Sequence, residues 1–447
     1  MRAVFLTLAL WLVASPAVAA PPEIPTELTD YVSKPDKSFL WKMAGEPVKT
    51  DFGTVSTIDM VSQTWQGIDW DHKIQIFVPP NVKPQATLVL WNEGGSPSIQ
   101  STILGFKVAE KLKAPFAILF GVPKQPLYGG KTEDALIAES FVRYLVTEDP
   151  SWPLLFPMVK SVVRGMDALQ AFAKKEWLID VTGFVITGAS KRGWTAWLTA
   201  ATGDKRVKAI APLVFDSLNI AVQMDNQVKA FTKPSDMIKD YGERLLIPIP
   251  KTAAAQRLWK IIDPWTYRER ITCPKLIVNG TNDEYWPLDA LNSYWDDLKG
   301  DKWVLYVPNA GHMLCESDKN GKMQPLPERT MATVAAFCRC QIFGKTMPMV
   351  DSTLICPIGG DCLDITVTAS LKPTAARIFS TDAESRDFRK SFWEPKPLAW
   401  GSDKTTCKIE GPKAGHQAAF VELGFEQDGM SYTLSTPLRI LPAPKKK

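Results

Sequence analysis

The chain has 447 residues, of which 45% are hydrophobic and 22% are charged. These ordinary globular values exclude a wholly disordered, collagen-like or coiled-coil protein, and the length allows two or three domains. The 52 Lys and Arg fall to 51 when Arg2 is removed with the expected signal peptide, against 48 Asp and Glu. The three C-terminal lysines account for the resulting excess of positive charge, 51 against 48. No basic block with interleaved aromatic residues occurs, so a nucleic-acid partner is not expected.

Residues 1–19 have the pattern of a secretory signal peptide. Arg2 supplies a short positive end, residues 3–14 are apolar, and a small-residue segment suits cleavage after Ala19. No later stretch has about 18 uninterrupted apolar residues, as a membrane-spanning helix would need. We therefore expect an exported protein, secreted or periplasmic, that has no membrane span.

The seven cysteines all follow this segment, at positions 273, 315, 338, 340, 356, 362 and 407. Because an exported chain meets an oxidising compartment, we expect disulfides, with at least one in the C-terminal segment. Cys273 enters a predicted buried strand and is the candidate free thiol, which leaves six cysteines for three bridges. A zinc site is the alternative, but Cys338-Arg339-Cys340 has the wrong ligand spacing and the chain has three histidines. We expect no metal and no cofactor.

Apolar strand-like runs alternate with segments of helical period between residues 73 and 340. The expected strands are Lys73–Val78, Ala86–Trp91, Pro115–Gly121, Gly183–Thr187, Val207–Phe215, Pro274–Val278 and Trp303–Val307. A helix is expected over Met158–Ala173, because its apolar residues recur at steps of three or four. This alternation is typical of a mostly parallel sheet wrapped by helices. We expect such an α/β domain over residues 20–345.

Two further segments depart from the alternation. Residues 216–270 mix polar and apolar sequence and are interpreted as a mostly helical insertion, placed where insertions form pocket roofs or lids. Over residues 350–441, short alternating runs separated by Gly, Pro and Asp predict a small all-β, sandwich-like domain. Residues 442–447 are expected to form a basic, solvated tail.

Ser190 is the candidate nucleophile. It follows an apolar strand and precedes a helix-compatible run, within Gly188-Ala189-Ser190-Lys191-Arg192-Gly193. A serine on such a strand-to-helix turn projects its hydroxyl at the top of the sheet. The pattern is G-x-S-x-x-G and differs from the commoner G-x-S-x-G, and a serine that caps a helix would fit the same residues.

A serine nucleophile needs a base, and the base needs a group that orients it. Asp283 and His312 lie just beyond the last two expected strands. Ser, Asp and His in this order, each on a loop after a strand, is the α/β-hydrolase arrangement. We therefore assign His312 as base and Asp283 as its partner, with Glu284 and Asp289 as alternatives for the acid.

The oxyanion of acyl transfer needs preorganised hydrogen-bond donors. We expect the backbone N–H of Lys191 and an amide at Gly94 or Gly95, where two glycines allow close approach of a substrate. The candidate substrate-binding side chains are Arg192, Trp265 and Tyr267. Surface ion pairing and core packing are the alternative uses of these three side chains.

Longer blocks of sequence extend this pattern. They are Trp70-Asp71-His72, Thr132–Ala138, Phe156–Lys160, Val163–Asp167, Gly188–Gly193, Asp263–Arg268, Asn282-Asp283-Glu284, Tyr294–Leu298 and Val307–His312. With these blocks the chain resembles the PhoPQ-activated pathogenicity-related proteins, a secreted branch of the α/β-hydrolase superfamily, over about residues 30–345. The G-x-S-x-x-G form belongs to that family too. The resemblance implies a serine hydrolase and supplies no substrate.

The function that the sequence favours is an exported serine hydrolase that cleaves an ester or peptide bond through an acyl-enzyme. Its substrate would be a small molecule or a peptide. One alternative is a non-enzymatic extracellular regulator that keeps the fold. Another is a carbohydrate-linked esterase, because glucuronoyl esterases share the G-x-S-x-x-G elbow with a basic residue after the serine. The sequence fixes neither the acyl group nor the oligomeric state.

Overall fold

The computed structural model describes residues 24–355 and 362–443, so the expected signal peptide, Cys356 and the last lysines lie outside it. The helices are α1 (Glu27–Ser33), α2 (Ile99–Leu112), α3 (Glu133–Thr147), α4 (Leu155–Phe172), α5 (Lys191–Ala201), α6 (Ile220–Phe231), α7 (Lys239–Glu243), α8 (Ala253–Ile262) and α9 (Glu328–Phe343). The first ten strands are β1 (Leu40–Met43), β2 (Val48–Thr50), β3 (Gly53–Trp65), β4 (Ile68–Val78), β5 (Thr87–Asn92), β6 (Phe116–Leu119), β7 (Gly183–Ala189), β8 (Val207–Leu213), β9 (Lys275–Gly280) and β10 (Lys302–Val307). The later strands are β11 (Val350–Ile355), β12 (Cys362–Ala369), β13 (Ala375–Ala383), β14 (Glu394–Pro397), β15 (Lys404–Glu410), β16 (His416–Gln427), β17 (Met430–Ser435) and β18 (Arg439–Pro442).

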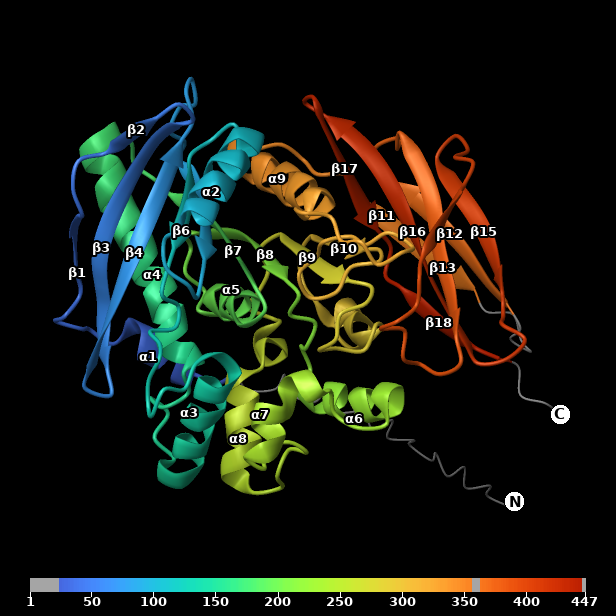
Figure 1. Cartoon of the computed structure of the whole chain (residues 1–447), viewed down its shortest axis with the longest axis horizontal. Helices are drawn as coiled ribbons and strands as arrows, with labels where there is room; N and C mark the ends of the chain where they lie inside the picture. The colour runs from blue at the N-terminus through green and yellow to red at the C-terminus, as the bar shows by residue number, and fades with distance from the viewer. Residues whose placement is uncertain (1–23, 356–361, 444–447) are drawn as a thin grey trace, which may run out of the picture.

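A long mixed sheet crosses the molecule in the order β1-β3-β4-β6-β5-β7-β8-β9-β10-β17-β16-β13-β14 (Figure 1). Its centre, from β6 to β10, is parallel, whereas β4 pairs antiparallel with β6. All seven strands expected from the sequence are present, as β4 to β10, and the expected helix is α4. The carboxyl ends of the parallel strands therefore meet at one edge of the sheet.

The parallel strands are buried on both faces, which explains their continuous apolar sequences. Adjacent residues enter different cores, with Val89 and Val185 on the side of α2 and α9 and Leu90 and Ile186 on the side of α4 and α5. This alternation follows from the two-residue period of a strand. The sheet thus separates two hydrophobic cores.

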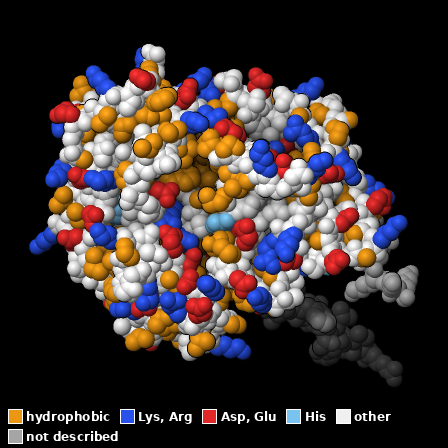
Figure 2. Space-filling view, viewed as in Figure 1, with side chains coloured by type: hydrophobic (Ala, Val, Ile, Leu, Met, Phe, Trp, Pro, Cys, Tyr) orange, Lys and Arg blue, Asp and Glu red, His pale blue; other side chains and the backbone are white. Residues whose placement is uncertain are grey.

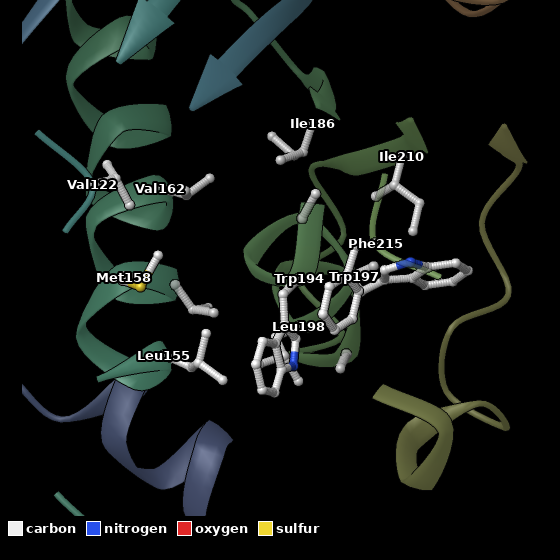
Figure 3. Packing of buried hydrophobic residues seen from close by; sticks show 14 of the residues in the cluster. Val122, Leu155, Met158, Val162, Ile186, Trp194, Trp197, Leu198, Ile210 and Phe215 are labelled. Atoms are coloured by element: carbon white, nitrogen blue, oxygen red, sulfur yellow. The ribbon is translucent and has the colours of Figure 1, made fainter. Parts of the chain in front are cut away.

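Helices α4 and α5 pack together on one of these faces. Figure 3 shows Met158 and Val162 on α4 and Trp197 and Leu198 on α5, and all four belong to one hydrophobic cluster. All four side chains are fully buried. This packing holds α5, which follows the turn after β7, against the rest of the domain.

The C-terminal region is antiparallel, as expected, and its strands extend the central sheet. β17 pairs with β10 at Val304 and Ser435, and the Ser435 hydroxyl accepts the Tyr306 N–H at 3.0 Å. β11, β12 and β15 form a second sheet of three strands. Ile365 of that sheet and Val421 of β16 belong to one core, which gives the sandwich-like packing. The architecture is an α/β-hydrolase fold with a C-terminal antiparallel β region.

The expected disulfides are not seen among the six described cysteines, all of which are free. Cys362 lies opposite Glu410, whereas Cys407 lies opposite Ile365, so the two cysteines of neighbouring strands are out of register. An offset of three residues is about 10 Å along a strand, beyond the Cα separation of about 7 Å that a disulfide spans. No pair of cysteines within residues 24–355 and 362–443 is bridged, so the expected bridges are not found there, and a bridge that involves Cys356 lies outside the described residues. The same described residues contain no helix long and apolar enough to cross a membrane.

Candidate functional site

Ser190 lies on the turn between β7 and α5, with φ 57° and ψ −123°. Positive φ is strained for a residue with a side chain and persists only where the surroundings hold it. Here the Ser190 N–H donates to the Leu213 carbonyl at 2.8 Å, and the Ser190 carbonyl accepts the Trp194 N–H at 3.0 Å. The serine therefore sits on a strained turn fixed from both sides, as a nucleophile elbow requires.

The two glycines of G-x-S-x-x-G are explained by close packing. A Cβ on Gly188 would lie 2.6 Å from Asn92 Nδ2, and one on Gly193 would lie 2.9 Å from the Leu213 carbonyl oxygen. Both approaches are shorter than a carbon atom tolerates. The second glycine therefore stands three residues after the serine because α5 contacts the end of β8 there.

His312 and Asp283 are brought together by the loops that follow β10 and β9. His312 Nδ1 is 2.8 Å from Asp283 Oδ2, and the other carboxylate oxygen accepts the Tyr285 N–H at 2.8 Å. The Tyr285 ring stacks on the imidazole with centroids 4.1 Å apart. These contacts orient the imidazole so that Nε2 is the nitrogen left for proton transfer.

His312 Nε2 is shielded from solvent and has no hydrogen-bond partner among the described residues. In particular, no hydrogen bond joins it to Ser190 in the described residues. Catalytic hydrogen bonds are often long without substrate and tighten in the Michaelis complex. Tyr285 contacts the surroundings of both residues, since its ring stacks on His312 and it lines the pocket that contains Ser190.

The alternative acids contact other groups. Glu284 Oε2 accepts the backbone N–H of His312 at 3.3 Å, and Asp289 forms an ion pair with Arg386. Neither carboxylate has a hydrogen bond to the imidazole ring within the described residues. The geometry therefore favours Asp283 as the partner of His312.

The expected oxyanion donors lie at the start of α5 and on the loop after β5. Lys191 is the first residue of α5, where a backbone N–H has no partner within the helix. The Gly94 N–H donates to Glu93 Oε1 at 2.8 Å and is therefore occupied. The Gly95 carbonyl accepts the Gly121 N–H at 3.0 Å, which fixes the loop, and the Gly95 N–H has no acceptor among the described residues. Lys191 and Gly95 thus remain the available donors.

Arg192 holds the elbow to its surroundings. Its two terminal nitrogens donate to the Glu133 carboxylate at 2.6 and 2.7 Å, and Nε donates to the Val122 carbonyl at 2.7 Å. The guanidinium also packs on Gly94, where an added Cβ would lie 1.6 Å from Nη2. These contacts occupy the donors that a substrate carboxylate would need.

The Lys191 side chain is also held in an ion pair. The other two substrate-binding candidates, Trp265 and Tyr267, do not line the pocket that contains Ser190. Lys191 Nζ donates to Asp134 Oδ2 at 2.7 Å. The Trp265 indole N–H donates to Asp297 at 2.9 Å, and the fully buried Tyr267 donates to the Ile261 carbonyl at 2.8 Å.

The segment 216–270 contributes part of the lining of the pocket at Ser190. Ser217, Met224, Ile238, Tyr241, Ile247 and Trp259 of that segment line it, together with Trp194, Phe215, Trp286 and the Lys191–Asp134 pair. Sequence reasoning missed Tyr285, Asp134 and Glu133 as site residues. Thr132–Ala138 is one of the blocks that carry the family resemblance, but nothing in the sequence places it beside α5. No group of three or more potential metal ligands occurs within the described ranges.

The ion pair of Glu133 and Arg192 should make stability depend on pH. Burial raises the pKa of Glu133, but hydrogen bonds and charge from Arg192 outweigh it and lower the pKa to about 2. A carboxyl whose folded pKa is depressed stabilises the fold above its ordinary pKa and loses that contribution as the pH falls toward the folded value. The urea stability of wild type should therefore approach that of Glu133→Gln between pH 4.5 and 2.

Glu410→Gln provides the control, because this strand carboxylate has 73% of its side chain exposed and pairs only with Lys408 among the described residues. The free energy of unfolding of Glu410→Gln should differ little from that of wild type at any pH. If the difference in the free energy of unfolding between wild type and Glu133→Gln stayed constant across the acid range, the role assigned to the Glu133–Arg192 pair would be contradicted.

The comparison with protein families agrees with the resemblance seen in the sequence. The model of the family described as "PhoPQ-activated pathogenicity-related protein" matches residues 28–389, most of the chain. The chain belongs to this family. The match extends beyond the hydrolase core into the C-terminal β region, through β13.

A curated relative, autocrine proliferation repressor protein A of Dictyostelium discoideum, is 28% identical over 440 residues, with 89% of this chain and 85% of the relative covered. Among solved structures, acetyl xylan esterase 1 from Thermoanaerobacterium sp. JW/SL YS485 is 16% identical with a TM-score of 0.46, over 64% of this chain and 89% of that one. An S-formylglutathione hydrolase from Agrobacterium tumefaciens is 14% identical with a TM-score of 0.41, over 61% and 92%.

Proposed function

We propose that this protein is a serine hydrolase in which Ser190 is the nucleophile, His312 the general base and acid, and Asp283 the group that orients the imidazole. The observation that carries the proposal is the 2.8 Å contact of His312 Nδ1 with Asp283, and the position of Ser190 on a strained strand-to-helix turn supports it. The function needs all three groups, because a serine hydroxyl is a weak nucleophile until a base takes its proton.

The reaction then runs in two halves. Ser190 Oγ attacks the substrate carbonyl carbon while its proton passes to His312 Nε2, and the carbonyl oxygen becomes an oxyanion facing the N–H groups of Lys191 and Gly95. Collapse breaks the bond to the leaving group, which takes the proton from His312 and leaves an acyl-enzyme. Water attacks the acyl carbon, gives a proton to His312, and the acid departs as the proton returns to Ser190. The charge of Asp283 stabilises the imidazolium in both halves.

A regulatory role without catalysis is the second candidate, because the curated relative is called an autocrine proliferation repressor. The carbohydrate-linked reading loses its particular support, since Lys191, the basic residue after the serine, is paired with Asp134 at 2.7 Å. We further propose export through cleavage after Ala19, a roof over the site formed by residues 216–270, and a β-rich unit over residues 350–441. The substrate would be a small molecule or peptide.

Labelling with a fluorophosphonate probe separates an enzyme from a regulator without knowledge of the substrate. The wild-type protein should bind the probe covalently, and Ser190→Ala should not. Ser217→Ala is the matched control, because Ser217 lines the same pocket and has no role in the mechanism. Folded wild-type protein that stays unlabelled, or Ser190→Ala that labels as wild type does, would reject the proposed hydrolase.

A further inference from the structure

The pocket beside Ser190 limits the acyl group that the enzyme can accept. We infer that this group is short, about two to four carbons, because its pocket is far smaller than the cavities of about 150 Å³ that admit benzene. This inference rests on the proposed function and names its substrate class. It concerns the acyl group alone, since the rest of the substrate has room elsewhere.

The acyl pocket has a volume of about 40 Å³. Its walls are rigid: Trp194 stacks on Phe215 with centroids 4.8 Å apart, and Trp286 packs edge-on against Phe215 at 6.3 Å. The Trp194 indole N–H donates to the Ile262 carbonyl at 2.7 Å, which fixes that ring. Because close-packed aromatic walls yield little, the volume limits the chain length of the acyl group.

The segment 216–270 also contributes to the pocket. Met224 of α6 and Trp259 of α8 are part of its lining, with exposed fractions of 9% and 8%. Trp259 is held edge-on against Phe141 of α3, with centroids 5.8 Å apart. Met224 is the flexible, unbranched member of the lining and is therefore the residue whose truncation should lengthen the pocket.

A second depression lies beside the oxyanion loop and is of a different kind. It has a volume of about 480 Å³, is lined by Gly94, Gly95 and Lys124, and is within the range of about 300–1,000 Å³ usual for ligands. Its walls carry ion pairs, among them Lys73 with Asp59 at 2.6 Å. A polar alcohol portion fits this depression, which leaves the small apolar pocket to the acyl group.

An apolar cavity between α2 and α9 is the place where a long acyl chain would fit. It has a volume of about 150 Å³ and is lined by Leu104, Val108, Met331 and Val334, among others. Figure 2 shows hydrophobic side chains around a hollow in the face that carries these helices. This cavity, however, lies in the core on the other side of the sheet from Trp194 and Phe215. An acyl group that enters the pocket at Ser190 does not reach it.

The test compares p-nitrophenyl acetate, butyrate and octanoate. Wild type should hydrolyse the acetate and the butyrate with kcat/KM at least about tenfold above that of the octanoate. The reason is that the longer acyl chain of the octanoate does not fit a rigid pocket and therefore loses kcat/KM. Met224→Ala should shrink this ratio about tenfold or more by admitting longer chains. Met331→Ala removes the same atoms from the α2–α9 cavity at an exposed fraction of 8%, and its ratio should stay that of wild type.

Near-ultraviolet circular dichroism establishes that both variants fold, and Met224→Val replaces Met224→Ala if the latter does not. A wild-type preference for octanoate overturns the inference, and a change of the ratio in Met331→Ala alone assigns the chain to the other cavity. An unchanged ratio in folded Met224→Ala also overturns it. In each case fluorophosphonate labelling of Ser190 persists, whereas failure of the proposed hydrolase removes labelling and ester cleavage together.

Discussion

Ser190→Ala and His312→Ala should each lower kcat/KM for p-nitrophenyl acetate at least about a thousandfold, because the members of a catalytic triad act as a unit. Without Ser190 Oγ no acyl-enzyme forms, and without His312 Nε2 nothing takes the serine proton at neutral pH. The residual rate comes from substrate binding and the oxyanion donors. Initial rates on variants with wild-type circular dichroism give the comparison.

Asp283→Asn should lose less activity than either of these variants, since the serine and the imidazole remain. The loss should still be large, because an amide cannot stabilise the imidazolium as a carboxylate does. Glu284→Gln and Asp289→Asn serve as matched controls, as one contacts the His312 backbone and the other pairs with Arg386. If either control collapses while Asp283→Asn keeps the wild-type rate, the acid has been assigned to the wrong residue.

The central sheet was predictable because parallel strands are buried on both faces and therefore read as continuous apolar runs. β3 was not predicted from the sequence, although it is the longer strand of the hairpin that it forms with β4. Its sequence, Gly53–Trp65, is rich in Ser, Thr and Gln, and two of these polar residues are fully buried: Ser62 and Gln63. Gln63 Nε2 donates to the Pro157 carbonyl of α4 at 2.8 Å. Because the polar partner of this buried residue lies almost a hundred residues away in the sequence, a local pattern does not predict that the strand is buried.

The chemistry of the site was predictable where it depends on the end of a strand, and less so where it depends on a distant partner. Asp283 and His312 follow β9 and β10 directly, so their meeting follows from the parallel sheet. Arg192 is a substrate-binding candidate in the sequence, with ion pairing as the alternative, and its actual partner Glu133 stands 59 residues earlier, beyond the reach of a local pattern. The absence of a Cys362–Cys407 bridge has a related reason, since cysteine count and compartment say nothing of strand register.

Arg192 should be needed for both stability and rate. Arg192→Met leaves Glu133 with only the Gln125 amide at 2.7 Å and the more distant Lys191 ammonium at 3.5 Å, and it removes the donor to the Val122 carbonyl. It should lower the free energy of unfolding by about 2–4 kcal/mol. The estimate lies below that of a fully buried pair because 40% of the Glu133 side chain is exposed and can be hydrated. Arg192→Lys should not restore stability, since an ammonium cannot make the two parallel bonds to the carboxylate.

The same substitution should slow catalysis, because the guanidinium packs against Gly94, and Gly94 precedes Gly95, the proposed oxyanion donor. A small displacement of that loop should lower kcat for p-nitrophenyl acetate by about tenfold to a hundredfold. Lys408→Met is the control: Lys408 pairs with Glu410 at 3.0 Å, with 54% and 73% of the two side chains exposed, and its loss should cost little stability and no activity. Urea unfolding and initial rates on both variants decide the matter. Equal stability of the two variants would show that Arg192 is replaceable, and an unchanged kcat in folded Arg192→Met would separate the oxyanion loop from its support.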